Sequence, residues 1–210
     1  MPVMLLAAAA PQAAPAPRTA IDAERAFAAD AQTLGQWTAF RKWAATDATM
    51  FEPQPVDAQL TLKTRRDPAK PIAWSPTAGF TSCDGRVAAN TGEWRGPGGT
   101  VGFFTTIWVR QADGSWRWVV DGGDTLTAAR QRVERPPVQR AACHARPAPP
   151  AAIQYREGRS DQRVSPDGTF AWRWHVSGSG ARTFEALLWT GRAWTTVIAD
   201  RIAAPPASKS

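Results

Sequence analysis

Apolar residues between Cys83 and Asp124 come in three runs that are separated by glycine-rich turns. Residues 86–94 and 100–110 are rich in Val, Thr, Phe, Ile and Trp, which suit a half-buried strand, and the Gly-Pro-Gly-Gly between them cannot continue either strand. An Asp-Gly pair then separates the second run from a third that begins at Trp116, and Asp-Gly between apolar runs is a strong hairpin signal. The pattern predicts three consecutive antiparallel strands.

The pairing of the second hairpin depends on the length of its loop. A two-residue loop places Val109 beside Trp118, whereas a three-residue loop with a bulge at Gly114 shifts the pairing by one residue and places Trp108 beside Trp118. We expect the two-residue loop, which places Ile107, Val109, Trp118 and Val120 on one face that looks like core.

Helical periodicity precedes this region. Thr19 with Asp22 three residues later predicts a capping box at a helix start. The apolar stripe of the first helix consists of Ala23, Phe27, Ala31 and Leu34. Gly35 is expected to end or kink this helix, and a second helical piece is expected over residues 36–45. Residues 46–53 predict a turn and a short strand, and residues 57–72 one or two helical turns.

A second set of strands is expected near the C-terminus. One face of the first of these strands carries Phe170, Trp172, Trp174 and Val176. Residues 183–189 and 194–199 predict two returning strands. A three-stranded unit cannot bury such a face alone, so we expect it to pack on the first domain, with a partner or ligand surface as the alternative.

These elements define the expected organisation of the chain. We expect a signal-like or disordered tail at 1–18, an α+β domain at 19–124, a short helix (125–133) followed by a proline-rich linker in 125–150, a β-meander at 151–202 and a disordered tail at 203–210.

The composition indicates no nucleic-acid, metal or cofactor site. The net charge of +7 is spread over scattered arginines with acidic residues between them, so no specific nucleic-acid partner is expected. Eleven tryptophans stand against one tyrosine, and tryptophans spread over helices and strands more often fill a core than line a cofactor site. The two histidines do not have zinc-ligand spacing, so neither a metal nor a cofactor is expected.

The N-terminus and the cysteines indicate a compartment. Residues 1–17 have a short apolar run followed by small residues, as in a secretory signal, although no Lys or Arg precedes the run. We therefore expect a periplasmic or secreted protein without a membrane span; a disordered Ala/Pro tail is the alternative. Cys83 and Cys143 fit that compartment as one disulfide, with two free thiols as the alternative.

Several motifs together resemble a known superfamily. The residues AERAFAAD, AFRKWAATDATMFEP, WSP, DGRVAANTGEW and VRQADGSWRWVVDGGD resemble nuclear transport factor 2-like proteins, in particular bacterial proteins related to polyketide cyclases and ketosteroid isomerases. The resemblance covers about residues 23–124. It implies a cone-shaped curved sheet wrapped on the N-terminal helices, an apolar pocket at the wide end, and dimerisation through the open sheet face in many members.

Candidate site residues follow from position and from this resemblance. Asp121 at a strand end and Glu52 are candidate catalytic carboxylates, with a solvated strand-end role as the alternative for Asp121. Alternation places either Met50 with Glu52, or Phe51, inside, and we expect Phe51. The aromatic candidates for the pocket wall are Trp37, Trp74, Trp94, Phe104 and Trp108.

Three functions remain open from the sequence. The first is an exported protein that binds a small apolar or amphipathic molecule without turnover. The second is an enzyme of the isomerase, cyclase or dehydratase kind with Asp121 or Glu52 as base, although relatives with such activity bring an acid and a hydroxyl or histidine together, and the matching region has no histidine and no tyrosine. The third is an interaction module that works through the C-terminal meander or the sheet face.

Overall fold

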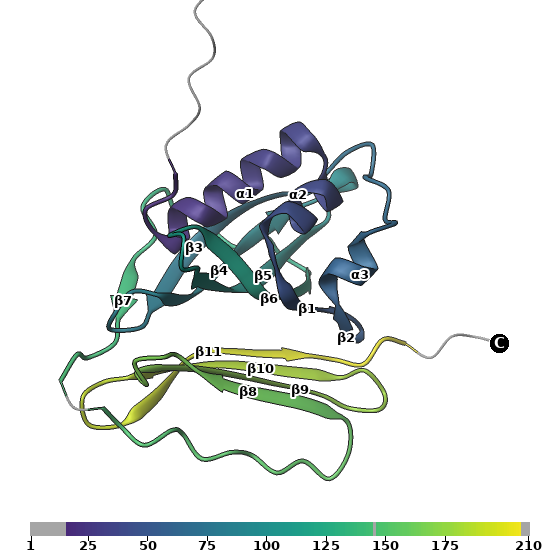
Figure 1. The fold of residues 1–210 in the computed structure, drawn as a ribbon. Coiled ribbons are helices and arrows are strands. Elements are labelled where there is room, and N and C mark those ends of the chain that lie inside the picture. Colours follow the sequence, from purple (N-terminus) through teal and green to yellow (C-terminus); the bar gives the residue numbers. More distant parts are fainter. Residues whose placement is uncertain (1–15, 145, 207–210) are drawn as a thin grey trace, which may run out of the picture.

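The structure, a computed structural model, describes residues 16–144 and 146–206. The helices are α1 (Ala20–Leu34), α2 (Gln36–Trp43) and α3 (Ala58–Leu62). The strands are β1 (Ala44–Glu52), β2 (Gln54–Asp57), β3 (Ala73–Thr81), β4 (Val87–Arg95), β5 (Val101–Arg110), β6 (Trp116–Leu126), β7 (Val138–Arg140), β8 (Arg159–Val164), β9 (Phe170–Val176), β10 (Arg182–Trp189) and β11 (Trp194–Ile202). They form an α+β fold in which α1 and α2 cover one side of a large sheet and the last four strands lie on its other side (Figure 1). Within the described residues, no helix is long and apolar enough to cross a membrane.

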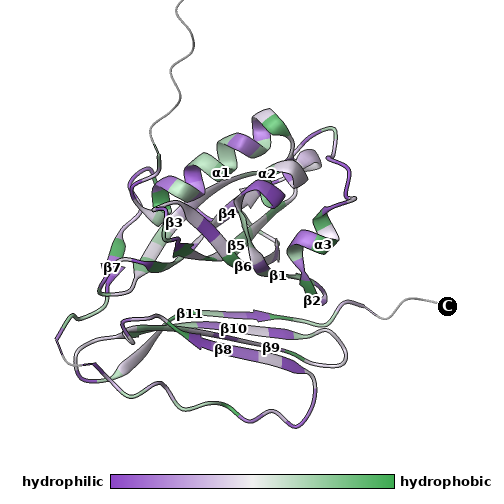
Figure 2. Ribbon diagram, viewed as in Figure 1, coloured by the Kyte–Doolittle hydropathy of each residue, from purple (hydrophilic) through white to green (hydrophobic). Residues whose placement is uncertain are grey.

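The two N-terminal helices form as the sequence predicts. Thr19 accepts a hydrogen bond from the backbone N–H of Asp22, and the Asp22 carboxylate accepts one from the N–H of Thr19, which completes the capping box. Hydrophilic and hydrophobic residues alternate along α1 (Figure 2), whose apolar face packs on the sheet. Gly35, with a φ of 103°, separates the two helices, and a side chain there would collide with the carboxylate of Asp67. Glycine is therefore required at this junction.

Asp67 caps α2 from outside the helix. Its carboxylate accepts hydrogen bonds from the backbone N–H groups of Trp37 (2.5 Å) and Thr38 (3.0 Å) and from the Thr38 hydroxyl (2.6 Å). Because α2 has no side-chain cap of its own, we expect Asp67→Ala to lower the free energy of unfolding by about 1 kcal/mol. Urea denaturation measures this. Asp67→Asn keeps an acceptor oxygen and should lose less; equal losses would contradict the capping role.

The large sheet is mixed, with the strand order β2-β1-β6-β5-β4-β3-β7. Strands β1 and β6 run parallel, as do β3 and β7, and all other neighbours are antiparallel. The three predicted central strands correspond to β4, β5 and β6. Gly102 of β5 allows the Trp94 side chain of β4 to pack closely over the strand, because a Cβ at position 102 would overlap the indole of Trp94 and the carbonyl of Asp124.

The register expected for the β5–β6 hairpin is wrong next to its loop. Trp108 pairs with Trp118, and Val109 pairs with Arg117 instead of Trp118. The loop is longer than two residues, since the N–H of Gln111 donates to the carbonyl oxygen of Ser115 at 2.7 Å. The Asp113 carboxylate accepts hydrogen bonds from both the N–H and the hydroxyl of Ser115 within this loop. A bulge at Val119 of β6, opposite Ile107 and Trp108, then restores the expected pairing farther along the strands.

The C-terminal strands form a separate antiparallel sheet with the order β11-β10-β9-β8. It contains β8 in addition to the three strands expected. The predicted aromatic face of β9 is buried against the large sheet, with Phe51 of β1 edge-on to Trp174 at 5.4 Å. This sheet covers the sheet face that the sequence suggested as a possible homodimer surface. A homodimer through that face would require the second sheet to move away.

The segment between the two sheets differs from the expectation. Residues 125–133 form no helix; β6 extends to Leu126, and the chain then follows the edge of the sheet to β7. Arg130 stacks over Phe103 at 4.6 Å, and Arg132 pairs with the buried Glu93 at 2.6 Å. These contacts and the two prolines that follow hold the segment out of a helix.

The two cysteines are joined in a disulfide that ties this segment to the loop after β3. The predicted signal-like run lies almost wholly outside the described residues, as do the last four residues of the C-terminal tail.

Candidate functional site

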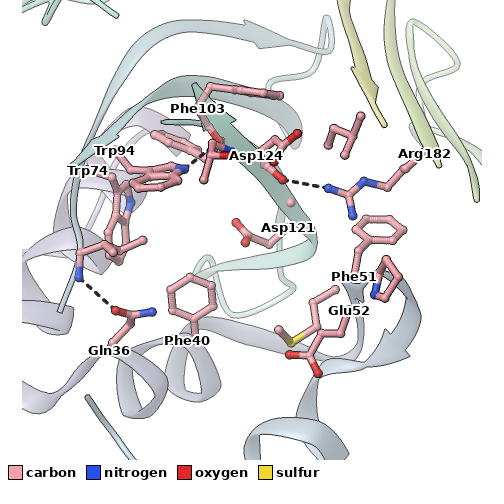
Figure 3. Close-up of a pocket in the computed structure, with 18 of the residues that line it drawn as sticks. Gln36, Phe40, Phe51, Glu52, Trp74, Trp94, Phe103, Asp121, Asp124 and Arg182 are labelled. Carbon is pink, nitrogen blue, oxygen red and sulfur yellow. Dashed lines mark hydrogen bonds between the residues drawn. The ribbon is translucent and has the colours of Figure 1, made fainter. Parts of the chain in front are cut away.

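A cavity of about 560 Å³ lies between the helices and the large sheet, and the start of β10 and the chain after β11 complete its wall. Most of its wall is aromatic or aliphatic, as is typical of small-molecule sites. Its aromatic residues are Phe27, Trp37, Phe40, Phe51, Trp74, Trp94, Phe103 and Phe104. Its charged residues are Glu52, Asp121, Asp124 and Arg182. Figure 3 shows the labelled members of this wall, among them Phe40, Trp74 and Asp121, arranged around the open centre of the cavity.

Asp121 projects into the cavity from β6 (Figure 3). Its partner across the sheet is Thr106, whose hydroxyl donates a hydrogen bond to one carboxylate oxygen at 2.7 Å. Burial raises the pKa of Asp121 to about 7, although the Thr106 hydrogen bond and the positive charge of Arg182 act in the opposite direction. The carboxyl group can therefore take up or release a proton near neutral pH.

A second carboxyl group, Glu24 of α1, lies behind the cavity wall. It is fully buried and accepts hydrogen bonds from the indole N–H groups of Trp74 (2.9 Å) and Trp108 (2.7 Å). Burial raises the pKa of Glu24 to about 7, and the nearby charge of Asp121 raises it further, while the indole hydrogen bonds oppose the shift. Glu24 does not line the cavity. Its carboxylate holds the indoles of Trp74 and Trp108 in place.

Arg182 reaches the cavity from the second sheet. One of its guanidinium nitrogens donates to the carbonyl oxygen of Gly123 at 3.0 Å, and the group stacks over the ring of Phe51 at 4.2 Å. Burial lowers the pKa of Arg182, and the negative charges of Asp124, Asp121 and Asp200 oppose this shift. The C-terminal sheet therefore contributes a charged group to the cavity as well as covering the large sheet.

Glu52 and Gln36 complete the polar part of the wall. Glu52 lies at the end of β1 and forms an ion pair with Arg65. The Gln36 side-chain oxygen accepts a hydrogen bond from the backbone N–H of Ile72 at 3.0 Å, which fixes the amide at the wall. Met50, Phe51 and Glu52 all border the cavity at the end of β1, whereas strand alternation had predicted only Phe51.

Four of the five aromatic candidates line the cavity, namely Trp37, Trp74, Trp94 and Phe104. Trp108 does not line it. Its side chain is fully buried, and its indole N–H points to Glu24 in the core between α1 and the sheet. Of the two candidate carboxylates, Asp121 and Glu52 both border the cavity, but Glu52 already has a cationic partner.

Sequence reasoning missed Arg182, Asp124 and Gln36. Arg182 follows a glycine-rich turn at the start of a strand. Nothing in its local sequence connects it to Gly123, its hydrogen-bond partner in the cavity wall, which lies 59 positions earlier. Gln36 directly follows the helix-breaking Gly35, and this position at a helix junction is the only signal that could have drawn attention to it. Among the described residues, no cluster of three or more potential metal ligands is present.

Comparison with known proteins gives weak similarities. No family model and no curated protein matches the chain. A solved structure of a putative ketosteroid isomerase from Shewanella frigidimarina has 16% sequence identity and a TM-score of 0.36, and the match covers 50% of this chain and 95% of the other. A putative aromatic ring hydroxylase from Novosphingobium aromaticivorans has 14% identity and a TM-score of 0.35, with coverage of 52% and 87%. Similarities of this size support no inference about function, which therefore rests on the cavity itself.

Proposed function

We propose that this chain is an exported protein that binds a small amphipathic molecule in the cavity between its helices and its large sheet. The observation that carries the proposal is a cavity of about 560 Å³ with an aromatic wall and few polar groups, which is within the usual size range for small-molecule sites. In this proposal, residues 19–124 form a cone-like domain of the nuclear transport factor 2-like kind, and the second sheet closes one side of its pocket.

Binding can be tested with a neutral fluorescent probe, N-phenyl-1-naphthylamine. Thr125 is an exposed residue at the edge of the cavity, so Thr125→Trp should place an indole over the opening and weaken probe binding about tenfold or more. Thr195→Trp introduces the same side chain at an exposed position of β11 that does not line the cavity, and should leave binding unchanged. Equal affinity in both variants would place the probe elsewhere and contradict the proposal.

Export is supported by the signal-like sequence of residues 1–17 and by the disulfide, because disulfides persist in oxidising compartments. We expect the protein recovered from the periplasmic fraction of a bacterial host to begin close to residue 18. Intact-mass measurement checks this, and a full-length protein confined to the cytoplasm would contradict export.

Acid–base catalysis is a second candidate function, favoured by the Asp121 carboxyl group in an apolar cavity with a pKa of about 7. If the bound molecule is turned over, we expect the rate to change with pH around 7 and Asp121→Asn to reduce kcat by about 100-fold or more. An Asp121→Asn variant with unchanged kcat would exclude this role.

A further inference from the structure

We propose that the ligand of the cavity is a cationic amphipathic amine, held by Asp121 and by the aromatic wall. This inference rests on the proposed function, because it specifies the chemical class of the molecule that the cavity binds. Three features of the cavity support it: a carboxylate without a partner cation, an acidic balance of charges and a wall of aromatic rings.

Asp121 forms no ion pair with a cationic residue that the structure describes, although the charge of Arg182 acts on it. Its hydrogen bond comes from the neutral Thr106 hydroxyl. The nearby guanidinium of Arg182 donates to the carbonyl oxygen of Gly123 instead. A carboxylate in an apolar site is costly unless a cation pairs with it. A ligand ammonium group would supply that cation.

The charges around the cavity also favour a cation. Glu52, Asp121 and Asp124 line it, against the single cation Arg182. Glu52 is balanced by Arg65, and Arg182 lies close to the charges of Asp124 and Asp200 as well as Asp121. The positive charge of Arg182 is therefore shared among three carboxylates, and Asp121, which forms no ion pair, is left as the acid that a ligand can reach.

Aromatic rings suit the rest of such a ligand. An ammonium group is attracted to the face of an indole or phenyl ring, and the attraction is larger away from water. The protein itself places cations on rings of this wall: Arg65 lies 4.8 Å from the centre of the Trp37 ring, and Arg182 lies 4.2 Å from that of Phe51. The inner wall at Trp74 and Phe40 then offers apolar surface for the body of the molecule.

The proposal predicts that amine binding depends on pH. The titratable groups around Asp121 are Glu24 on α1, Glu52 on β1, Asp124 on β6 and Arg182 on β10. An alkylamine stays protonated far above neutral pH, so its binding should depend on the ionisation of Asp121, whose pKa is about 7. We expect the affinity for an amine to rise about tenfold between pH 6 and pH 8. A neutral molecule should show no such increase.

A matched set of probes tests this inference on the full chain. 4-Phenylbutylamine, 4-phenylbutanol and 4-phenylbutanoate share an apolar body and differ in their polar end. Isothermal titration calorimetry at pH 8 should show the amine binding at least fivefold more tightly than the alcohol, and the carboxylate most weakly. Asp121→Asn should remove both the preference for the amine and its increase with pH. Asp113→Asn, in the exposed β5–β6 loop, serves as the control and should change neither.

The outcomes separate the two proposals. If N-phenyl-1-naphthylamine binds in the cavity but the alcohol or the carboxylate binds as tightly as the amine at pH 8, the amine inference is overturned and the binding function stands. The same holds if none of the three phenylbutyl probes binds. If the naphthylamine probe also fails to bind, the binding function falls as well. Because the pH dependence is measured on the unchanged protein, the test does not depend on the stability of Asp121→Asn.

Discussion

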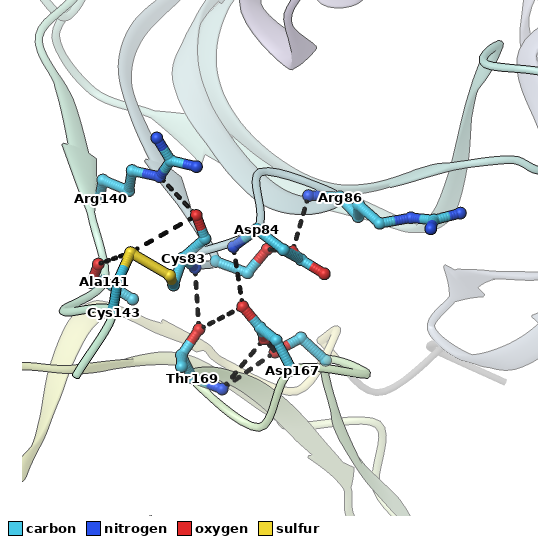
Figure 4. The surroundings of a disulfide bond; sticks show 10 residues. Cys83, Asp84, Arg86, Arg140, Ala141, Cys143, Asp167 and Thr169 are labelled. Carbon is cyan, nitrogen blue, oxygen red and sulfur yellow. Dashed lines mark hydrogen bonds between the residues drawn. A yellow bond between two sulfur atoms is a disulfide. The ribbon is translucent and has the colours of Figure 1, made fainter. Parts of the chain in front are cut away.

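Removal of the Cys83–Cys143 disulfide is expected to lower the free energy of unfolding by about 4 kcal/mol, because the bond closes a loop of 60 residues and so restricts the unfolded chain. The bond also lies where the two sheets meet. Next to it, the N–H of Cys83 donates to the Thr169 hydroxyl at 2.8 Å, and the N–H of Asp84 donates to the Asp167 carboxylate at 2.9 Å (Figure 4). Loss of the bond should therefore weaken the attachment of the second sheet.

Urea denaturation with and without a reductant measures this effect. Cys143 is exposed, so the reductant should reach the bond in the folded protein. A Cys83→Ala/Cys143→Ala variant should have the lower stability under both conditions, which controls for other effects of the reductant. A loss of less than 1 kcal/mol would show that hydrogen bonds and packing between the sheets dominate the attachment. A loss of probe binding in the same variant, at a urea concentration where it is folded, would show that the attachment of the second sheet is needed to complete the cavity wall.

Local signals in the sequence were sufficient for the two N-terminal helices and the central strands, but not for the helix expected over residues 125–133, which does not form. Thr19, Asp22 and Gly35 define the start and end of α1, because capping and positive φ depend on residues close together in the chain. Strand β3 was missed because it contains Pro76, which is tolerated where β4 is its only neighbour and where the ladder has a bulge. Strand β8 was missed because it is a polar edge strand, and such strands lack an apolar pattern.

The candidate site was predictable only in part, because some of its residues are brought together by contacts between distant segments that leave no local pattern in the sequence. Asp121 and four aromatic residues of the wall lie in or beside elements whose pattern is local. Arg182 is brought to the cavity by the packing of one sheet on another, and no periodicity encodes that contact. Trp108 was wrongly expected in the cavity wall, although its strand was predicted correctly. Its indole N–H donates to the buried carboxylate of Glu24 on α1, which is 84 positions away in the sequence.

That buried carboxylate, Glu24, should make the protein less stable as the pH rises toward 7. The pKa of Glu24 is about 7 in the folded protein and about 4.5 in the unfolded chain, so the folded protein binds the proton more tightly. Stability is therefore greatest below pH 4.5 as far as this group is concerned, and it falls as the pH rises toward 7. The shift corresponds to a loss of about 3 kcal/mol.

Chemical denaturation at intervals from pH 4 to pH 8 measures this loss of stability. Asp121 also has a raised pKa and so also lowers stability as the pH rises; the Asp121→Asn variant removes that contribution. In that background, Glu24→Gln should abolish the remaining decrease between pH 4.5 and 7. It should also be less stable at acid pH, because its amide N–H₂ would face indole N–H groups that need an acceptor. If Glu24→Gln kept the full decrease, the ionisation of a different group would be responsible. Because Glu24 holds Trp74 in the cavity wall, its ionisation should also change the tryptophan fluorescence of the folded protein over the same pH range.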